Sequence, residues 1–357
     1  MKGSITEIKM TNILFLITKS EVGGAQKWVR EQLELLPEQY TGFLWTNCEG
    51  WLSKNLSVQC TFNKAIEKRF SIFFIIKLFF FLRNKRISLV VASSANAGLY
   101  SRLACFFTKV PVIYVSHGWS SIYNGGRLTK FYNFVEKILS NLTCKIICVS
   151  NSDLVKARSV IGINEEKLIL IPNKVRPNYR QRDFVCANNN VPIRLLTLAR
   201  LKRPKRFDIL IEAVADTEDT ELHVFGDGPD LVHLMEQCQA QNWSQIFFHG
   251  EVSDFCDFCN YDAFILISDS EGMPCSAIEA MASGLPLILS NVGGCVELID
   301  GNGVLVINDV NAIKEAVNEL KNQRLPWSHN SKKLFEEKHN LVKSVSIYHA
   351  LYDRCAK

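Results

Sequence analysis

The sequence has little net charge and no long apolar run, and each of these absences excludes a class of protein. Its 357 residues carry a formal charge of only +5, too small to indicate nucleic-acid binding without a motif, although it favours anionic ligands or anionic lipid surfaces. Its apolar segments fall short of the roughly 20 residues that a transmembrane helix needs. Hydrophobic residues at 47% and charged residues at 22% are typical of soluble globular proteins. A chain of this length predicts two domains of ordinary size.

Several short motifs are missing as well. The glycine turn at residues 226–229 lacks the Gly-x-Gly-x-x-Gly of a dinucleotide site, which argues against an NAD enzyme. No Asp-x-Asp triplet occurs, so we expect neither a metal-bound diphosphate nor a metal cofactor. Twelve cysteines are scattered along the chain, and the lone pair Cys256 and Cys259 has no partners at zinc spacing. Without a signal peptide, reduced thiols in a cytosolic protein are expected.

The most informative stretch covers residues 268–284. The apolar residues 263–267 predict a buried strand, and a polar loop that contains Glu271 follows it. Pro274 suits the first turn of a helix that would carry Glu279. One carboxylate would then lie at the carboxyl end of a strand, where ligands of α/β sheets bind, close to a helix N-terminus that attracts phosphate. Two acceptors beside an anion site suit a phosphorylated, hydroxyl-rich ligand such as a nucleotide sugar.

This stretch resembles the signature of the retaining glycosyltransferases of family four, also called glycosyl transferases group 1. Their hallmark is Glu, seven residues, Glu, within Glu-Gly-(Met/Phe)-Pro…Glu-Ala-Met-Ala-x-Gly, and residues 271–284 contain it complete. The resemblance implies an α/β GT-B fold, in which two doubly wound parallel-sheet (Rossmann-like) domains face each other across a cleft. It implies an acceptor-binding domain at 1–175, a linker at 176–190, a nucleotide-sugar-binding domain at 191–339, and a C-terminal helix at 340–357 that crosses back to the first domain.

The resemblance also implies roles for individual residues. Arg200 and Lys205 keep the spacing with which the family grips the donor diphosphate, which a guanidinium and an ammonium can neutralise. The catalytic candidates are Glu271, on the sugar hydroxyls, and His117, which follows a strand and would point at the transferred sugar. The other assignments are Gly272 and Met273 at the diphosphate, Glu279 at the ribose, Gly226 and Gly228 at the nucleotide, and Gly23 and Gly24 in a loop facing the cleft.

Three positions depart from the family pattern. Ala199 and Arg206 stand where the diphosphate-binding string has glycine, and Lys174 stands where glycine normally follows an asparagine. The last substitution puts the local turn in doubt but changes no proposed catalytic group.

Residues 66–86 have the most unusual composition in the chain. The apolar core from Phe70 to Leu82 is bracketed by Lys and Arg and is apolar nearly all round if helical, whereas a helix that only packs on a sheet needs one apolar face. The segment could be such a sheet-packing helix, but the surplus apolar face with basic edges favours contact with an anionic membrane surface. The residues assigned to that contact are Phe73, Phe74, Lys77, Phe80, Phe81, Arg83, Lys85 and Arg86.

Together these features predict a hexosyltransferase that uses a UDP-sugar or GDP-sugar as donor. The acceptor would be a lipid-linked saccharide, as in assembly of bacterial O-antigen or capsule, and the protein would be cytoplasmic and peripheral on the inner face of the cytoplasmic membrane. Two alternatives remain open. One is a nucleotide-sugar epimerase or hydrolase on the same fold, and the other is an inactive donor-binding scaffold at the membrane.

Overall fold

The computed structural model describes residues 10–54, 56–123, 125–177 and 192–356, which form two compact units. Unit 1 comprises residues 1–171 and 343–357, and unit 2 comprises residues 172–342. The two units therefore divide slightly before residue 175, where the sequence placed the end of the first domain. Most of the expected linker lies outside the described residues.

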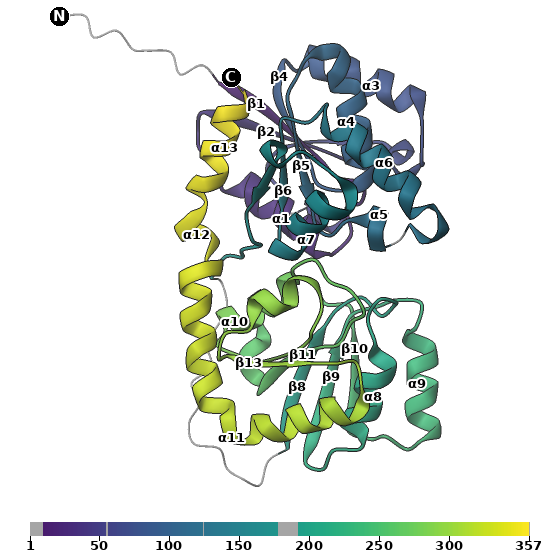
Figure 1. Cartoon of the computed structure of the whole chain (residues 1–357), viewed down its shortest axis with the longest axis vertical. Coiled ribbons are helices and arrows are strands. Elements are labelled where there is room, and N and C mark those ends of the chain that lie inside the picture. The colour runs from purple at the N-terminus through teal and green to yellow at the C-terminus, as the bar shows by residue number, and fades with distance from the viewer. Residues whose placement is uncertain (1–9, 55, 124, 178–191, 357) are drawn as a thin grey trace, which may run out of the picture. The chain divides into compact units, whose positions relative to one another are not determined.

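Unit 1 is built on a seven-stranded sheet in which every neighbouring pair of strands is parallel (Figure 1). The strand order is β3-β2-β1-β4-β5-β6-β7, so the chain moves outward from β1 first in one direction and then in the other. The strands are β1 (Thr11–Leu16), β2 (Tyr40–Thr46), β3 (Gln59–Phe62), β4 (Ile87–Ala92), β5 (Val112–Ser116), β6 (Lys145–Cys148) and β7 (Leu168–Leu170).

Helices cover both faces of this sheet because its central strands are apolar on both sides. Leu14 and Val90 face a core shared with α3 and α4, whereas Phe15 on the opposite face meets Tyr352 of α13, with ring centroids 6.2 Å apart. The C-terminal helix thus packs on unit 1. The helices and turns are α1 (Gly24–Glu34), α2 (Trp51–Lys54), η1 (Lys64–Glu67), α3 (Ile72–Asn84), α4 (Ala95–Thr108), α5 (Ser120–Tyr123), η2 (Gly126–Leu128), α6 (Thr129–Ser140), α7 (Asn151–Lys156), η3 (Ala157–Ile161), η4 (Glu165–Lys167) and α13 (Ser346–Ala356).

The helix expected between residues 66 and 86 is observed as α3, but two of its assigned membrane residues point inward. Phe74 is only 1% exposed and packs against Trp45 and Tyr100, with ring centroids 5.3 Å and 4.7 Å away. Phe81 is half-buried against Trp45 at 4.9 Å. The assignment of Phe74 to a membrane contact is therefore wrong, because the helical period places it on the stripe that covers the sheet, whereas Phe81 is only partly buried against the same core.

Unit 2 contains a six-stranded sheet, again with every neighbouring pair parallel, in the order β10-β9-β8-β11-β12-β13. Its strands are β8 (Ile193–Leu198), β9 (Thr220–Phe225), β10 (Ile246–Gly250), β11 (Ala263–Leu266), β12 (Leu287–Ser290) and β13 (Gly303–Val306). Its helices and turns are α8 (Phe207–Ala215), α9 (Leu231–Ala240), η5 (Asp257–Asn260), α10 (Cys275–Ala282), η6 (Gly293–Leu298), α11 (Val310–Leu334) and η7 (Phe335–His339). The short α12 (Leu341–Ser344) follows where the chain passes from unit 2 to unit 1.

The two sheets confirm the predicted fold class, a pair of doubly wound, Rossmann-like α/β domains. Apolar residues of β8, β9 and β11 form the core of unit 2 together with α8 and α11. None of the helices within the described ranges has both the length and the hydropathy needed to cross a bilayer.

Candidate active site

The strand order of unit 2 puts a switch point between β8 and β11, from which the chain proceeds in opposite directions. Ligands of open α/β sheets bind beyond the carboxyl ends of the strands at such a point. The loops that leave these two strands meet there, since Lys205 forms a bridge with Ser268 and the Arg206 amide donates to the Ile267 carbonyl at 2.9 Å. The Asp269 amide donates to the Pro204 carbonyl at 2.8 Å.

At this junction the ammonium of Lys205 contacts the carboxylate of Glu271 directly. Their side chains are only 17% and 11% exposed, so solvent screens the pair less than it screens an ordinary surface ion pair. The structure thus brings together the residue expected at the donor diphosphate and the residue expected at the sugar hydroxyls. Each charge is balanced by the other.

The backbone around Glu271 is held from several sides. Gly293 has a left-handed φ of +51°, and a Cβ there would lie 1.8 Å from the Glu271 carbonyl oxygen. The Gly294 amide donates to the Gly272 carbonyl at 2.6 Å. Asn173 donates from its side-chain amide to the carbonyl of buried Met273 at 2.8 Å. These contacts fix the loop that presents Glu271, which a preorganised site requires.

Helix α10 begins immediately after this loop and carries Glu279. Pro274 precedes the helix at Cys275, and Gly284, with φ +81°, lies just beyond its end, so the expected helix is observed with shorter bounds. Glu279 is only 5% exposed. Glu279 is the fifth residue of this helix, about one turn beyond the end of the loop that carries Glu271.

Two arginines of the basic loop 199–206 form ion pairs with nearby aspartates. Arg203 pairs with Asp269 at 3.0 Å and Arg206 pairs with Asp208 at 2.9 Å, so these two guanidinium groups stabilise the conformation of the loop. Arg206, which replaces a family glycine, is accommodated by this network. Arg200, assigned to the diphosphate, is exposed.

Gly226 and Gly228 pack against the same loop rather closely. A Cβ at Gly226, whose φ is +142°, would lie 2.0 Å from the Ala199 carbonyl oxygen, and one at Gly228 would lie 2.2 Å from that of Leu201. Both positions therefore need glycine for packing, whether or not their backbone also borders a nucleotide. The small Ala199 stands where the family has glycine and leaves this approach intact.

Unit 1 holds the second group of predicted residues at its own switch point, between β1 and β4. Gly23 and Gly24 lie where the chain leaves β1 and enters α1. His117 follows β5, and its Nε2 is 2.8 Å from Ser93 Oγ, just after β4. Trp28 of α1 meets the imidazole edge-on, with ring centroids 5.7 Å apart. Burial lowers the pKa of His117 to about 4, so the ring is neutral at pH 7.

Two family patterns together match most of the chain. Glycosyltransferase Family 4 matches residues 22–179, and Glycosyl transferases group 1 matches residues 192–323. The Escherichia coli O-antigen biosynthesis glycosyltransferase WbnH is 44% identical over 301 residues, which cover 84% of this chain and 87% of the relative. The chain belongs to these glycosyltransferases.

More distant proteins agree with this assignment. An E. coli relative named UDP-Gal:alpha-D-GlcNAc-diphosphoundecaprenol alpha-1,3-galactosyltransferase is 24% identical over 99% of this chain and 98% of its own length. The crystal structure of Anabaena Alr3699/HepE in complex with UDP and glucose matches with a TM-score of 0.82 at 18% identity, over 95% of this chain and 98% of the other. That structural likeness supports the GT-B fold.

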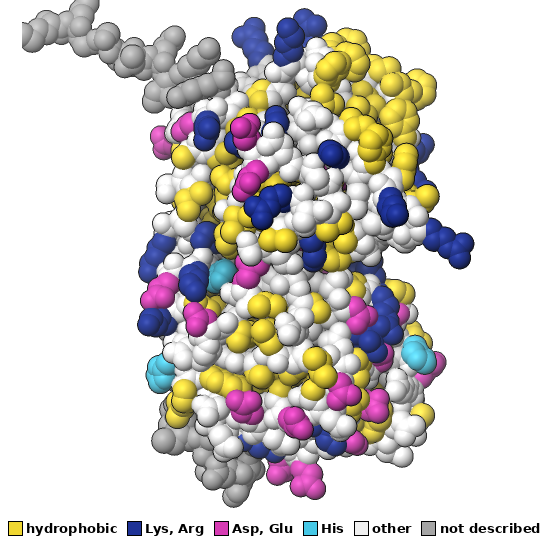
Figure 2. Space-filling model, in the orientation of Figure 1, with side chains coloured by type: hydrophobic (Ala, Val, Ile, Leu, Met, Phe, Trp, Pro, Cys, Tyr) yellow, Lys and Arg dark blue, Asp and Glu magenta, His cyan; other side chains and the backbone are white. Residues whose placement is uncertain are grey.

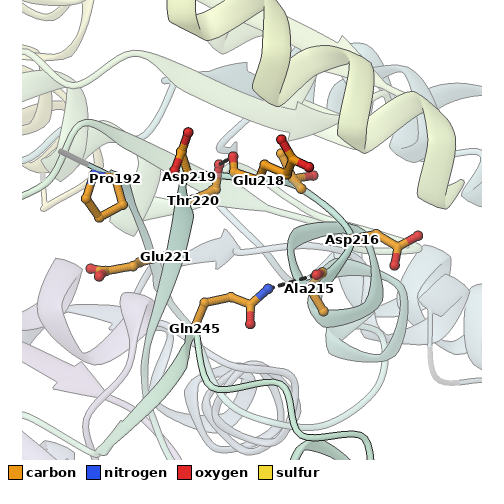
Figure 3. A pocket seen from close by; sticks show the side chains of 9 residues that line it. Pro192, Ala215, Asp216, Glu218, Asp219, Thr220, Glu221 and Gln245 are labelled. Atoms are coloured by element: carbon orange, nitrogen blue, oxygen red, sulfur yellow. Dashed lines mark hydrogen bonds between the residues drawn. The ribbon is translucent and has the colours of Figure 1, made fainter. Parts of the chain in front are cut away.

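One hollow in the glycosyltransferase lies away from this site. About 420 Å³ in volume, it lies at the amino ends of β8 and β9, opposite the edge that carries Lys205 and Glu271. Figure 3 shows that the acidic side chains around it diverge. Asp216 is paired with Lys314 at 3.1 Å, and Gln245 donates to the Ala215 carbonyl at 2.8 Å. This hollow lacks cations and convergent groups, so it is not the donor site.

Sequence reasoning missed three residues of the glycosyltransferase that hold the predicted site in place. Ser93 and Trp28 orient His117, and Asn173 holds the loop of Glu271. Ser93 could have been found, because it directly follows the apolar residues 89–92, whose pattern predicts a strand. Trp28 has the spacing of an ordinary core residue in an amphipathic helix, and Asn173 lies about a hundred positions from its partner. Within the described ranges, no group of three or more His, Cys, Asp or Glu side chains is placed to hold a metal ion.

Proposed function

We propose that this glycosyltransferase moves a hexosyl unit from a UDP-sugar or GDP-sugar to a hydroxyl of a lipid-linked saccharide, with retention of anomeric configuration and without a metal. The observation that carries the proposal is the contact between Lys205 and Glu271 at the carboxyl edge of β8 and β11. A cation for a diphosphate and an acceptor for sugar hydroxyls are adjacent there, as a nucleotide sugar would need them.

On this proposal the donor binds along the carboxyl edge of unit 2. Arg200 and Lys205 neutralise the diphosphate, Gly272 and Met273 border it through their backbone, and Glu279 accepts hydrogen bonds from the ribose. Lys205 must then share its charge between Glu271 and the incoming phosphates. Glu271 in turn becomes available to the sugar hydroxyls, so donor binding itself prepares the catalytic carboxylate.

In the proposed reaction, the bond from the anomeric carbon to the diphosphate oxygen breaks and a bond from that carbon to the acceptor oxygen forms. The nucleoside diphosphate leaves with its negative charge stabilised by Arg200 and Lys205, which replace a metal ion in this electrostatic role. As the new bond forms, the proton of the acceptor hydroxyl passes to the departing diphosphate oxygen. Neutral His117 contributes a hydrogen bond from unit 1, and because Ser93 occupies Nε2, a sugar hydroxyl would bind at Nδ1.

The proposed setting is assembly of O-antigen or capsule. The names of the two E. coli relatives support it, since one is an O-antigen biosynthesis glycosyltransferase and the other acts on a diphosphoundecaprenol-linked sugar. A prenyl-linked acceptor stays in a bilayer, so we propose that the protein is cytoplasmic and works on the inner face of the cytoplasmic membrane. The exposed residues of α3, among them Phe73, Lys77, Phe80 and Arg83, supply part of the membrane contact together with Arg86, which follows the helix.

A panel of nucleotide sugars tests the proposal. The correct donor should raise the melting temperature of the protein, since a ligand that binds only the native state stabilises it by mass action. That donor should release nucleoside diphosphate only when a lipid-linked saccharide is added. Stabilisation by no UDP-sugar or GDP-sugar would contradict the donor assignment, and equal release without acceptor would indicate a hydrolase.

A further inference from the structure

Three neighbouring helices of unit 1 present a broad apolar surface to solvent. Of the nine phenylalanines that are exposed among the described residues, seven belong to α3, α4 and α6 or immediately precede α3, and four Ile and Leu residues accompany them. We call these the apolar face: Phe70, Ile72, Phe73, Ile76, Phe80, Phe106, Phe107, Leu128, Phe131, Phe134 and Ile138. Figure 2 shows apolar side chains gathered over the α3 end of unit 1, at the upper right.

Inward-facing contacts hold these helices side by side, so the surface is one structural feature. Phe74 of α3 packs on Tyr100 of α4 at 4.7 Å, and the fully buried Arg102 of α4 pairs with Glu136 of α6 at 2.8 Å. Figure 1 draws the three helices next to one another. Each helix is thereby fixed with its remaining apolar residues outward.

On α6 the outward residues form a regular stripe. Phe131 is 58% exposed, Phe134 is 60% exposed and Ile138 is also exposed, at positions i, i+3 and i+7 of one helical face. Lys130 and Lys137 flank the stripe. A helix with its apolar stripe turned to solvent and lysines beside it has the composition of an interfacial helix rather than of a packing helix.

The charged residues around the apolar face indicate which kind of partner binds there. Its borders are strongly basic, with Lys68, Arg69, Lys77, Arg83, Arg86, Lys109, Arg127, Lys130 and Lys137 all exposed. Between residues 70 and 86 there is no acidic residue, and Glu136, the one acidic residue of α6, forms an ion pair with Arg102. Beside Lys77 a groove of about 430 Å³, lined by Phe73, Ile76 and Phe80 with Asn63 and Ala65, offers space for a lipid headgroup.

We infer that the apolar face is a bilayer-docking surface for anionic phospholipid, in which α6 forms a second contact that acts together with α3. The chain runs from His117 through α5 and η2 directly into α6, so docking of α6 fixes the segment that follows the proposed catalytic histidine at the level of the lipid headgroups. The docking itself does not depend on the proposed function. Only its consequence, that a lipid-linked acceptor is presented to that segment, rests on the proposed function.

The test compares α6 with a matched surface of unit 2. The variant Phe131→Ser/Phe134→Ser removes two exposed rings, and the control Val232→Ser/Met235→Ser removes two comparably exposed apolar residues from α9. Each protein is sedimented with vesicles of phosphatidylglycerol and phosphatidylcholine, and with pure phosphatidylcholine. The α6 variant should bind the anionic vesicles roughly tenfold to a hundredfold more weakly than wild type, with an unchanged melting temperature, and the control should bind as wild type does.

Activity assays separate this inference from the proposed function. The α6 variant should lose activity on a prenyl-linked acceptor while keeping wild-type stabilisation by the donor nucleotide. If wild type binds anionic vesicles and the α6 variant binds equally well, the role of α6 is wrong even if the transferase activity is correct. If wild type binds no vesicles but is a dimer that the α6 variant converts to a monomer, the apolar face is a protein interface and the inference fails.

Discussion

The replacement of Lys205 by methionine tests the proposed donor site most informatively, because this lysine contacts the proposed catalytic carboxylate. Lys205→Met keeps much of the side-chain length and removes the charge. A charge-assisted hydrogen bond to a phosphate contributes about 1.5–3 kcal/mol. Its loss corresponds to a decrease of about tenfold to a hundredfold in kcat/KM for the donor. The modest exposure of Lys205 supports the upper part of that range.

A double-mutant cycle with Glu271 then separates two roles of the lysine. If Lys205 served only to balance Glu271, replacing both residues would restore nucleotide binding. If Lys205 binds the diphosphate, Lys205→Met weakens binding of free nucleoside diphosphate in the wild-type and Glu271→Gln backgrounds alike. Glu271→Gln alone should leave that binding intact or tighten it, because the lysine no longer has to leave an ion pair, while turnover falls.

Isothermal titration with the nucleoside diphosphate and initial rates with the full donor provide the measurements. The matched control is Lys202→Met, an exposed cation three residues away in the same loop. It makes the same charge change and should have little effect. Unchanged nucleotide affinity in Lys205→Met, or an equal loss in Lys202→Met, would refute the assignment of Lys205 to the diphosphate.

Three further predictions follow from other parts of the structure. Glu279→Ala should weaken nucleotide binding itself, whereas Glu271→Gln should chiefly lower turnover, and titration together with kinetics would refute the assigned roles if the two phenotypes were exchanged. Burial lowers the pKa of both His117 and His339 to about 4, so the unfolded chain takes up protons that the folded protein does not, and the free energy of unfolding should fall as the pH falls from 6.5 to 4. In urea unfolding, the free energy of unfolding of the double variant His117→Gln/His339→Gln should fall less over that pH range than the free energy of unfolding of wild type. An equal fall in both proteins would contradict the buried neutral state of the two histidines. The hydrogen-bonded contact with Cys355, together with nearby Lys167 and Lys145, lowers the pKa of Cys144 to about 7. Mass spectrometry should therefore find half-maximal alkylation of Cys144 near pH 7 and at a higher pH in Cys355→Ala, which removes the contact, and no difference between the two proteins would contradict this effect of Cys355.

The sequence was a good guide to what depends on local pattern. The apolar runs predicted the parallel strands, and the string from Glu271 to Gly284 indicated the glycosyltransferase family that the comparisons confirm. The helix around residue 74 was expected as well. Its orientation was not, because a segment that is apolar nearly all round gives no period from which to tell Phe74, in the core, from Phe73, which is 80% exposed.

Contacts between residues far apart in the sequence also could not be predicted from local pattern. Neither the contact of Lys205 with Glu271 nor that of Asn173 with Met273 follows from any local spacing, since each joins residues more than sixty positions apart. The apolar stripe of α6 was missed for a related reason. Its spacing is that of an ordinary packing helix, and only the observed exposure of Phe131 and Phe134 shows that the stripe faces solvent.

The most direct test of the central claim is an acceptor-dependent transfer assay. The purified protein is incubated with radiolabelled UDP-sugars and GDP-sugars, with and without a prenyl-diphosphate-linked saccharide, in the presence of a chelator. The account predicts that one donor gives a labelled lipid-linked product and an equal amount of nucleoside diphosphate, both only when the acceptor is present, and that NMR shows the product linkage with the anomeric configuration of the donor. Label released as free sugar at the same rate without acceptor would contradict the assignment of a transferase, and a product of inverted configuration would contradict retention.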